Sequence, residues 1–276
     1  MVRRSIRFWP LLAVTLALAG WATQVAAASG GSPSPTMDRV AARGELILGT
    51  AGSMPPLNMT TRDGEVIGLD IDLARIIAAA METKLRVETM PFAELLPALE
   101  SGKVDLVISG MTMTPSRNRR FAFVGPYLVS GKSIVAKLAT AESIKKSSDL
   151  NVPEMTLVAL EGSTSAAFIE NLLPKATLVT VEDYDKGVKL VLEDQASALL
   201  ADQPICQISA YRYQDRGLVA LKDTLNYEPL GVALPPNDPL LVNWVENLIS
   251  GLEASGDLAK FRERWFEDTD WFAKLP

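Results

Sequence analysis

The sequence predicts an α/β fold made of two similar lobes with mostly parallel sheets. Apolar segments of strand length alternate with amphipathic segments of helical length along most of the chain, which is typical of α/β proteins. The order strand, helix, strand, helix, strand occurs twice, and each copy ends in a polar turn. Of the 276 residues, 248 follow the predicted signal peptide of residues 1–28, which is long enough for two modest cores or one large core.

Residues 1–28 have the pattern of a cleavable signal peptide. They combine a basic start, a short apolar core and small residues before the expected cleavage near Ala28, namely Arg3, Arg4, Arg7, residues 11–20, Ala26 and Ala28. The apolar core is too short to span a bilayer. Residues 29–36 are rich in Gly, Ser and Pro and are predicted to form a disordered leader. We therefore expect an exported, soluble protein.

The first copy of the repeated pattern begins after this leader. Its expected strands are residues 45–50, 85–89 and 104–109, and its expected helices are residues 69–80 and 92–101. The first helix carries apolar residues at helical spacing from Leu69 to Ala80, and Asp70 and Asp72 lie near its positive end.

The second copy begins at residue 155. Its expected strands are residues 155–160, 177–181 and 197–201, with helices after the first strand and around residues 184–193. Residues 237–266 are predicted to form two C-terminal helices.

Composition excludes several functional classes. The net charge of −6 becomes −9 without residues 1–28, which carry three arginines and no acid, so a nucleic-acid partner is not expected. The single cysteine, Cys206, permits no internal disulfide and is expected in the core. The absence of histidine excludes Ser-His-Asp and Cys-His triads and His-ligated zinc. No nucleotide-binding motif occurs, so no cofactor or metal is predicted. Catalysis by carboxylates alone remains open.

The segment VDLVISGMTMTPSR, residues 104–117, carries the clearest chemical signal. A buried strand ends at Gly110, and Thr114 with Pro115 predicts the start of a helix whose first turn contains Arg117. A strand end, free amides and a guanidinium together suit a carboxylate ligand. The alternative is an ordinary strand–turn–helix with a solvated arginine.

Five segments in order carry a resemblance to a known family: GELILGTAGSMPPLNM, DGEVIGLDIDLARIIA, MPFAELLPALESGKVDLVISGMTMTPSRNRRFAFVGPYL, LEGSTS and ALLADQP. The chain resembles the bacterial extracellular solute-binding proteins of family 3, the periplasmic polar amino-acid-binding components of ABC importers. This resemblance implies the two-lobed periplasmic-binding-protein fold of type II, with hinge crossovers near residues 127–131 and 226–230. It implies lobe 1 from residues 37–130 and 227–276, and lobe 2 from residues 131–226. It also implies a monomer in the periplasm that closes on an amino acid and delivers it to a permease in the inner membrane.

The resemblance assigns roles to six residues. Arg117 and Thr112 would bind the ligand carboxylate, together with free amides at the helix start beside Thr164. The carbonyl of Gly110 and the carboxylate of Asp202 would bind the ligand ammonium, and Phe92 would lie against the ligand side chain. Each residue also has a structural alternative. Thr112 and Thr164 would be helix caps, Asp202 a turn former before Pro204, and Phe92 a core residue.

The pocket departs from the family at three positions. Where many relatives carry an acid or an aromatic residue, this chain has Ala51, Met54 and Leu57. These residues predict a neutral or acidic amino-acid ligand, with polar uncharged side chains slightly favoured.

Two other functions remain open. One is an enzyme similar to the cyclohexadienyl dehydratases, for which Glu161 or Asp202 would have to supply the acid. The other is a soluble ligand sensor. Because no carboxylate pair stands out by its spacing, we expect a binding protein without catalytic activity.

Overall fold

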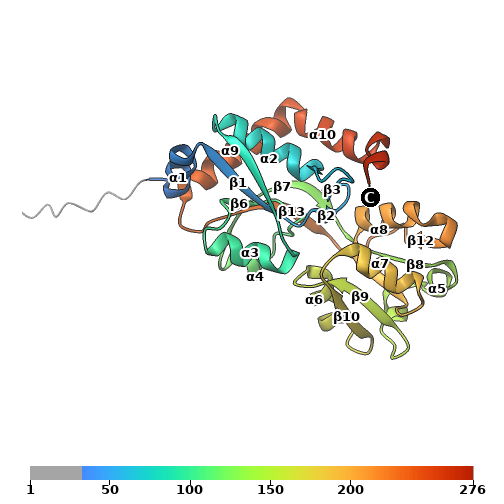
Figure 1. Ribbon diagram of the computed structural model, residues 1–276. Coiled ribbons are helices and arrows are strands. Elements are labelled where there is room, and N and C mark those ends of the chain that lie inside the picture. The colour runs from blue at the N-terminus through green and yellow to red at the C-terminus, as the bar shows by residue number, and fades with distance from the viewer. Residues whose placement is uncertain (1–32, 276) are drawn as a thin grey trace, which may run out of the picture. The chain divides into compact units, whose positions relative to one another are not determined.

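Two five-stranded sheets organise residues 33–275, the part of the chain that the computed structural model describes (Figure 1). The first sheet has the order β5, β1, β6, β13, β7, with the bounds Lys84–Thr89, Glu45–Thr50, Leu106–Val107, Glu228–Leu234 and Ala122–Ser130. The second has the order β10, β9, β11, β8, β12, with the bounds Thr177–Val181, Thr156–Leu160, Ala198–Asp202, Lys132–Lys137 and Leu218–Ala220. A small sheet contains β2, β3 and β4, with the bounds Ser53–Met54, Asn58–Thr60 and Val66–Ile67.

Each large sheet joins parallel and antiparallel strands in the same way. Strands β5, β1 and β6 are parallel. Strand β13 pairs antiparallel with β6, and β7 pairs antiparallel with β13. In the second sheet β10, β9 and β11 are parallel. Strand β8 pairs antiparallel with β11, and β12 pairs antiparallel with β8. The chain passes between the sheets twice, from β7 to β8 and from β12 to β13. The predicted α/β fold with two lobes and two crossovers is confirmed. The exact lobe boundaries remain a prediction.

Helices cover both faces of each sheet. In the first lobe they are α1 (Pro35–Arg43), α2 (Leu69–Ala80), α3 (Phe92–Glu100), α4 (Pro115–Asn118), α9 (Pro239–Ser255) and α10 (Asp257–Phe266). In the second lobe they are α5 (Leu138–Ser143), α6 (Thr164–Leu172), α7 (Tyr184–Leu192) and α8 (Gln203–Arg212). Short 3₁₀ helices occupy Ser147–Leu150, Gln214–Arg216 and Asp270–Lys274.

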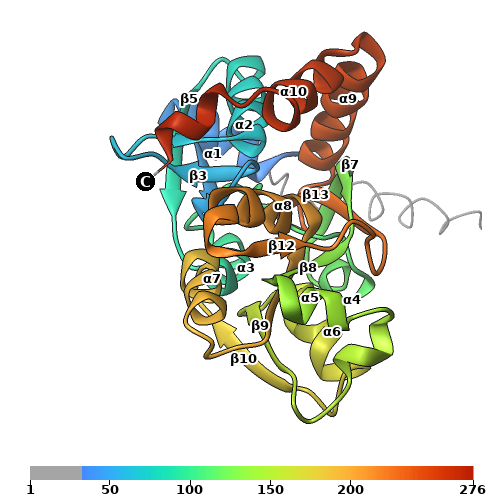
Figure 2. The same ribbon diagram turned by 90° about the vertical axis from the view of Figure 1, so that its right-hand side faces the viewer.

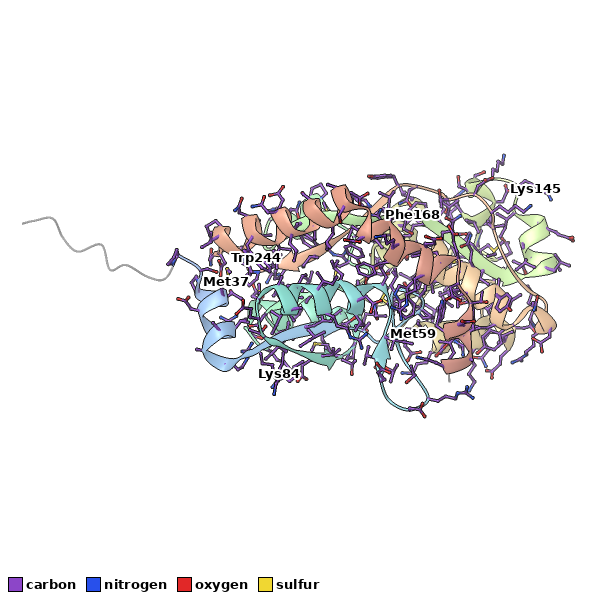
Figure 3. The ribbon with its side chains drawn as sticks, turned by 90° about the horizontal axis from the view of Figure 1, so that it is seen from above. Met37, Met59, Lys84, Lys145, Phe168 and Trp244 are labelled. Atoms are coloured by element: carbon purple, nitrogen blue, oxygen red, sulfur yellow. The ribbon has the colours of Figure 1, made fainter. Side chains whose placement is uncertain are left out.

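The alternation of side chains along the strands determines which helix each residue contacts. Leu46 and Leu48 pack in the apolar cluster of α2, α9 and α10, whereas Ile47 packs in the cluster of α3. Figures 1 and 2 show α2, α9 and α10 on one side of this sheet and α3 on the other. Figure 3 shows Met37 of α1 and Trp244 of α9 at the same end of this lobe, where both pack against its core. Burial on both faces explains why inner strands such as β1 and β11 are nearly continuous apolar runs.

The cluster around α3 continues into the second lobe, where it includes residues of β9, β11, α7 and α8. The other face of the second sheet packs against α6. Cys206 is fully buried within the continuous cluster, as predicted. None of the helices in residues 33–275 is both long and apolar enough to cross a membrane.

The predicted leader of residues 29–36 is wrong at its C-terminal end. Helix α1 begins at Pro35, and the Ser34 hydroxyl accepts a hydrogen bond from the amide of Met37 at 3.3 Å. The amide of Thr36 donates to Asp238 at 2.8 Å. Ser and Pro, which suggested disorder, are also the residues that favour a helix start. The signal peptide and residues 29–32 lie outside the described residues.

The predicted strand at residues 104–109 is shorter than expected, since β6 contains only Leu106–Val107. The residues on either side bind the neighbouring strand partly through their side chains. The Asp105 carboxylate accepts from the amide of Ile47 at 2.8 Å, and the Ser109 hydroxyl accepts from the amide of Ala51 at 2.9 Å. Asp105 also binds Arg39 at 3.0 Å and Arg43. This carboxylate therefore connects α1, β1 and β6.

We predict that Asp105→Ala lowers the free energy of unfolding by about 1–3 kcal/mol, because the buried amide of Ile47 loses its acceptor. The measurement is urea unfolding followed by circular dichroism. Asp185→Ala is the matched control, because it removes an exposed carboxylate paired with Arg212 at 3.2 Å; such pairs contribute about 0–1 kcal/mol. Equal losses in the two variants would contradict the role of Asp105.

Candidate functional site

The loop after β6 is held in place by a buried carboxylate. Gly110 has a φ of +56°, a conformation that glycine adopts without steric cost. A side chain there would lie only 2.9 Å from Leu57 Cδ1 and 3.1 Å from Met54 Cε. The Gly110 amide donates to Asp70 Oδ2 at 3.0 Å. Glycine is therefore required at this turn for both its conformation and its small size.

Asp70 lies in α2 and accepts two further hydrogen bonds, from Asn58 Nδ2 and from the Tyr127 hydroxyl, each at 2.7 Å. Asp70, Asn58 and Tyr127 are fully buried. Burial raises the pKa of Asp70 from 3.8 to about 7, while these three donors act in the opposite direction. The predicted role of Asp70 near a helix start is thus extended, because its side chain also fixes the loop of Gly110.

Helix α4 brings Arg117 to the same loop. Thr114 is its N-cap and accepts from the Arg117 amide at 3.2 Å, and Pro115 is the first helical residue, as predicted. Arg117 Nη1 donates to the Thr112 carbonyl at 2.8 Å, and Nη2 donates to the Gly162 carbonyl at 3.1 Å. The guanidinium therefore binds the first lobe and a loop of the second lobe. It also lies 5.7 Å from the centre of the Phe92 ring.

Two threonines meet where the lobes touch. The hydroxyls of Thr112 and Thr164 lie 3.3 Å apart, and Thr164 Oγ1 also donates to Glu228 Oε2 at 3.1 Å. The interpretation of Thr164 as a helix cap is wrong, because Ser163 caps α6 by accepting from the amide of Ala166. The Thr164 hydroxyl is instead directed at its partners in this contact.

Asp202 forms an ion pair that the sequence did not predict. Lys132 Nζ lies 2.9 Å from Asp202 Oδ1 and 3.6 Å from Glu228 Oε2. The side chains of all three residues are less than a tenth exposed. Asp202 precedes α8 without capping it through its side chain. Lys132 and Glu228 had one weak sequence signal, since each is a charged residue shortly before the apolar part of a strand.

The charges in this cluster influence one another. Burial lowers the pKa of Arg117 to about 10, whereas Glu228 and Asp202 raise it by charge. Burial raises the pKa of Asp202, and Lys132 opposes this shift through its charge and hydrogen bond. Asn226 Nδ2 donates to Glu228 Oε1 at 2.7 Å. Opposite charges from both lobes are thus paired where water is largely excluded.

The structure brings most of the predicted site residues together. Arg117, Thr112, Thr164 and Phe92 lie around one contact, and the charge of Asp202 reaches Arg117. Gly110 is linked to Asp70 rather than to these side chains. Phe92 is buried in the core and also contacts Arg117, so its two interpretations are compatible.

A cavity of about 320 Å³ lies between the two lobes, and none of the site residues described above lines it. It is lined by residues of both lobes, namely Ala51, Ser53, Thr89, Met90, Pro91, Glu182 and Asp183. The two acids already pair with Lys186, at 2.6 Å and 3.2 Å. Among residues 33–275 no group of acidic or cysteine side chains is arranged to hold a metal ion.

Comparison with known proteins identifies the family. The model of the bacterial extracellular solute-binding proteins, family 3, matches residues 46–268. This chain belongs to that family. The match includes both sheets and every residue of the site described above. The resemblance inferred from the five sequence segments is therefore confirmed.

Three relatives illustrate the range of the family. The chain is 24% identical to "ABC transporter arginine-binding protein 1" of Escherichia coli, covering 80% of this chain and 90% of that protein. It is 23% identical to cyclohexadienyl dehydratase of Pseudomonas aeruginosa, covering 88% of this chain and 90% of that protein. A crystal structure of a putative ABC-transporter binding component from Wolinella succinogenes, complexed with lysine, superimposes with a TM-score of 0.80 at 36% identity. That comparison covers 84% of this chain and all of the other.

We predict that Asp70 makes this protein less stable as the pH rises from about 4 to about 7. A carboxyl group whose pKa is raised by folding stabilises the folded state below its ordinary pKa of 3.8, and this contribution is lost as the pH passes its folded pKa of about 7. The slope from one such group is at most about 1.4 kcal/mol per pH unit.

The test compares denaturant unfolding of the wild type and Asp70→Asn at several pH values in this range. An asparagine keeps an oxygen for Gly110 and Asn58 and can donate to the Tyr127 oxygen, so it mimics the protonated acid. The difference in unfolding free energy between the two proteins should change with pH. A constant difference would show that Asp70 does not titrate here.

Proposed function

We propose that this protein captures an amino acid between its two lobes and delivers it to an ABC importer. Arg117 would bind the α-carboxylate, assisted by Thr112 and by the amides at the start of α6. Asp202 would bind the α-ammonium, and the Gly110 carbonyl would add a further acceptor. Phe92 would support the ligand side chain.

The observation that carries this proposal is the position of the Arg117 guanidinium. It donates to the Thr112 carbonyl in one lobe and to the Gly162 carbonyl in the other. A carboxylate is a stronger acceptor than either carbonyl and matches the fork of a guanidinium. A ligand carboxylate can therefore replace these two bonds without leaving the cation unpaired.

The position of Asp202 supports the same orientation of the ligand. Its carboxylate is buried in the second lobe and close enough to Arg117 to influence the pKa of the guanidinium. An α-amino acid carries its two charges one carbon apart, so its carboxylate and ammonium can reach both groups at once. Capture of a zwitterion uses both lobes.

We propose binding without chemical turnover. Glu161 is exposed, and Asp202 is held by Lys132, so neither is a free acid positioned over a substrate. Most of the relatives are named as binding proteins, with the dehydratase as an exception. The signal-peptide pattern of residues 1–28 supports export to the periplasm. There, we propose, the protein acts as a monomer with an inner-membrane permease.

We also propose that the ligand is a neutral or acidic amino acid. The supporting observation is that Ala51 lines the cavity between the lobes, while Met54 is buried beside Gly110. Neither can offer a negative charge to a cationic side chain. Some relatives are named for arginine, so this proposal separates the present chain from them.

We predict that Arg117→Ala weakens amino-acid binding tens- to thousands-fold while the protein stays folded. Removing one partner of a desolvated ion pair costs about 2–5 kcal/mol. Calorimetric titration with the amino acid that binds the wild type best measures the loss. Arg120→Ala is the matched control, because Arg120 pairs with exposed Glu100 instead. Similar affinities in wild type and Arg117→Ala would reject the carboxylate site.

We further predict that the ligand closes the lobes in solution. The contacts between Arg117 and Gly162 and between Thr112 and Thr164 join the two lobes. A bound amino acid would replace the Arg117–Gly162 bond with its own contacts to both lobes and so favour the closed arrangement. Small-angle X-ray scattering should show a smaller radius of gyration at saturating ligand than without it. Arg117→Ala should show no contraction at the same ligand concentration. Identical wild-type profiles would contradict ligand-driven closure.

A further inference from the structure

Lys132 is a buried lysine at the centre of the site. It is the first residue of β8 and pairs in register with Asp202, the last residue of β11. Directly opposite residues of adjacent strands project to the same side of the sheet. The Lys132 side chain is 1% exposed, and lysine is rarely buried to this extent unless it is paired. Its position is therefore fixed by the sheet and by its two carboxylate partners.

The charges around Lys132 balance without a ligand. Arg117 and Lys132 are the cations, and Asp202 and Glu228 are the anions. Lys132 contacts both acids, at 2.9 Å and 3.6 Å, and the same acids act by charge on Arg117. The Asp70 carboxyl belongs to a separate network, because its partners are three neutral donors of its own. The cluster that faces the cleft has no net charge.

This balance restricts the ligand. A neutral amino acid brings one positive and one negative charge, so the cluster stays neutral when the cleft closes. An arginine or lysine ligand would add an unpaired buried cation beside two cations already present, which is strongly unfavourable. The two acids of the neighbouring cavity, Glu182 and Asp183, share the single lysine Lys186, and their side chains are 64% and 30% exposed. Water therefore screens their remaining charge, which cannot compensate a buried cation.

We propose that Lys132 determines the specificity of this protein, so that the site takes a neutral α-amino acid and rejects amino acids with cationic side chains. The inference rests on the proposed function and narrows its ligand class. The ligand ammonium meets Asp202 and Glu228 beside Lys132, which supplies the positive charge that a cationic side chain would otherwise bring.

The test measures calorimetric affinities for the twenty protein amino acids with the wild type and three variants. The wild type should bind at least one neutral amino acid at least about tenfold more tightly than arginine or lysine, a difference of about 1.4 kcal/mol. Lys132→Met gives the cluster one negative charge and should raise the affinity for arginine or lysine, relative to that neutral amino acid, by at least about tenfold. Lys137→Met is the control on the same strand, because Lys137 is partly exposed and pairs with Asp194. It should leave the ratio unchanged.

Glu228→Gln keeps Lys132 and gives the cluster one positive charge, the opposite of the change made by Lys132→Met. It should lower the relative affinity for arginine and lysine and raise that for glutamate. This variant tests the proposal even if Lys132→Met does not fold. The role of Lys132 would be overturned if the wild type prefers arginine or lysine. It would also be overturned if the affinity for arginine or lysine, relative to the neutral amino acid, does not rise in folded Lys132→Met and fall in folded Glu228→Gln. If the wild type binds no amino acid at all, the proposed function itself fails.

Discussion

The pairing of buried charges is the constraint on which the contact between the lobes depends. Lys132 and Asp202 come from adjacent strands of the second sheet, and Glu228 begins a strand of the first. None of the three can be buried alone without a large desolvation cost. The register of β8 against β11 and the crossover into β13 must therefore place all three together. The Glu228 carboxylate also accepts hydrogen bonds from the Thr164 hydroxyl and the Asn226 side-chain amide, and so positions both groups.

A second buried carboxylate organises the other side of the site. Asp70 binds the Gly110 amide, and the turn at Gly110 leads to Thr112 and the short helix that carries Arg117. The two networks differ in the groups that stabilise the buried carboxylate. Asp70 is surrounded by neutral donors, whereas Asp202 faces a full positive charge. One network shapes the backbone of the loop, and the other sets the electrostatics of the cleft. This separation allows ligand preference to change without rebuilding the loop.

Local patterns predicted much of this structure. The strand at residues 45–50 was identified with its exact bounds, as were Thr114 as a cap and Pro115 at the helix start, because apolar runs and caps depend on neighbouring residues. Lys132 and Glu228 were missed because their partners lie far away along the chain, and only strand register brings them together. The small sheet of β2, β3 and β4 was missed because its strands contain only two or three residues. The disordered leader predicted for residues 29–36 extends too far, because Thr36 at its C-terminal end is held by a hydrogen bond to Asp238, which is distant in the sequence.

The two crossovers also have a mechanical consequence. Strands β7 and β13 are paired up to Ser130 and Glu228. Beyond this pair, the Lys132 amide donates to the side chain of Asn226, and the Lys132 carbonyl accepts from the Leu225 amide. A side chain at Gly131 would lie 2.4 Å from the Asn226 carbonyl, so the two segments run in direct contact. They form one two-stranded ribbon, which bends across its face far more easily than its strands slide. A rotation of one lobe against the other would therefore have this ribbon as its axis. Lys132 lies at this ribbon, so a rotation of one lobe about it would move the Lys132 side chain little.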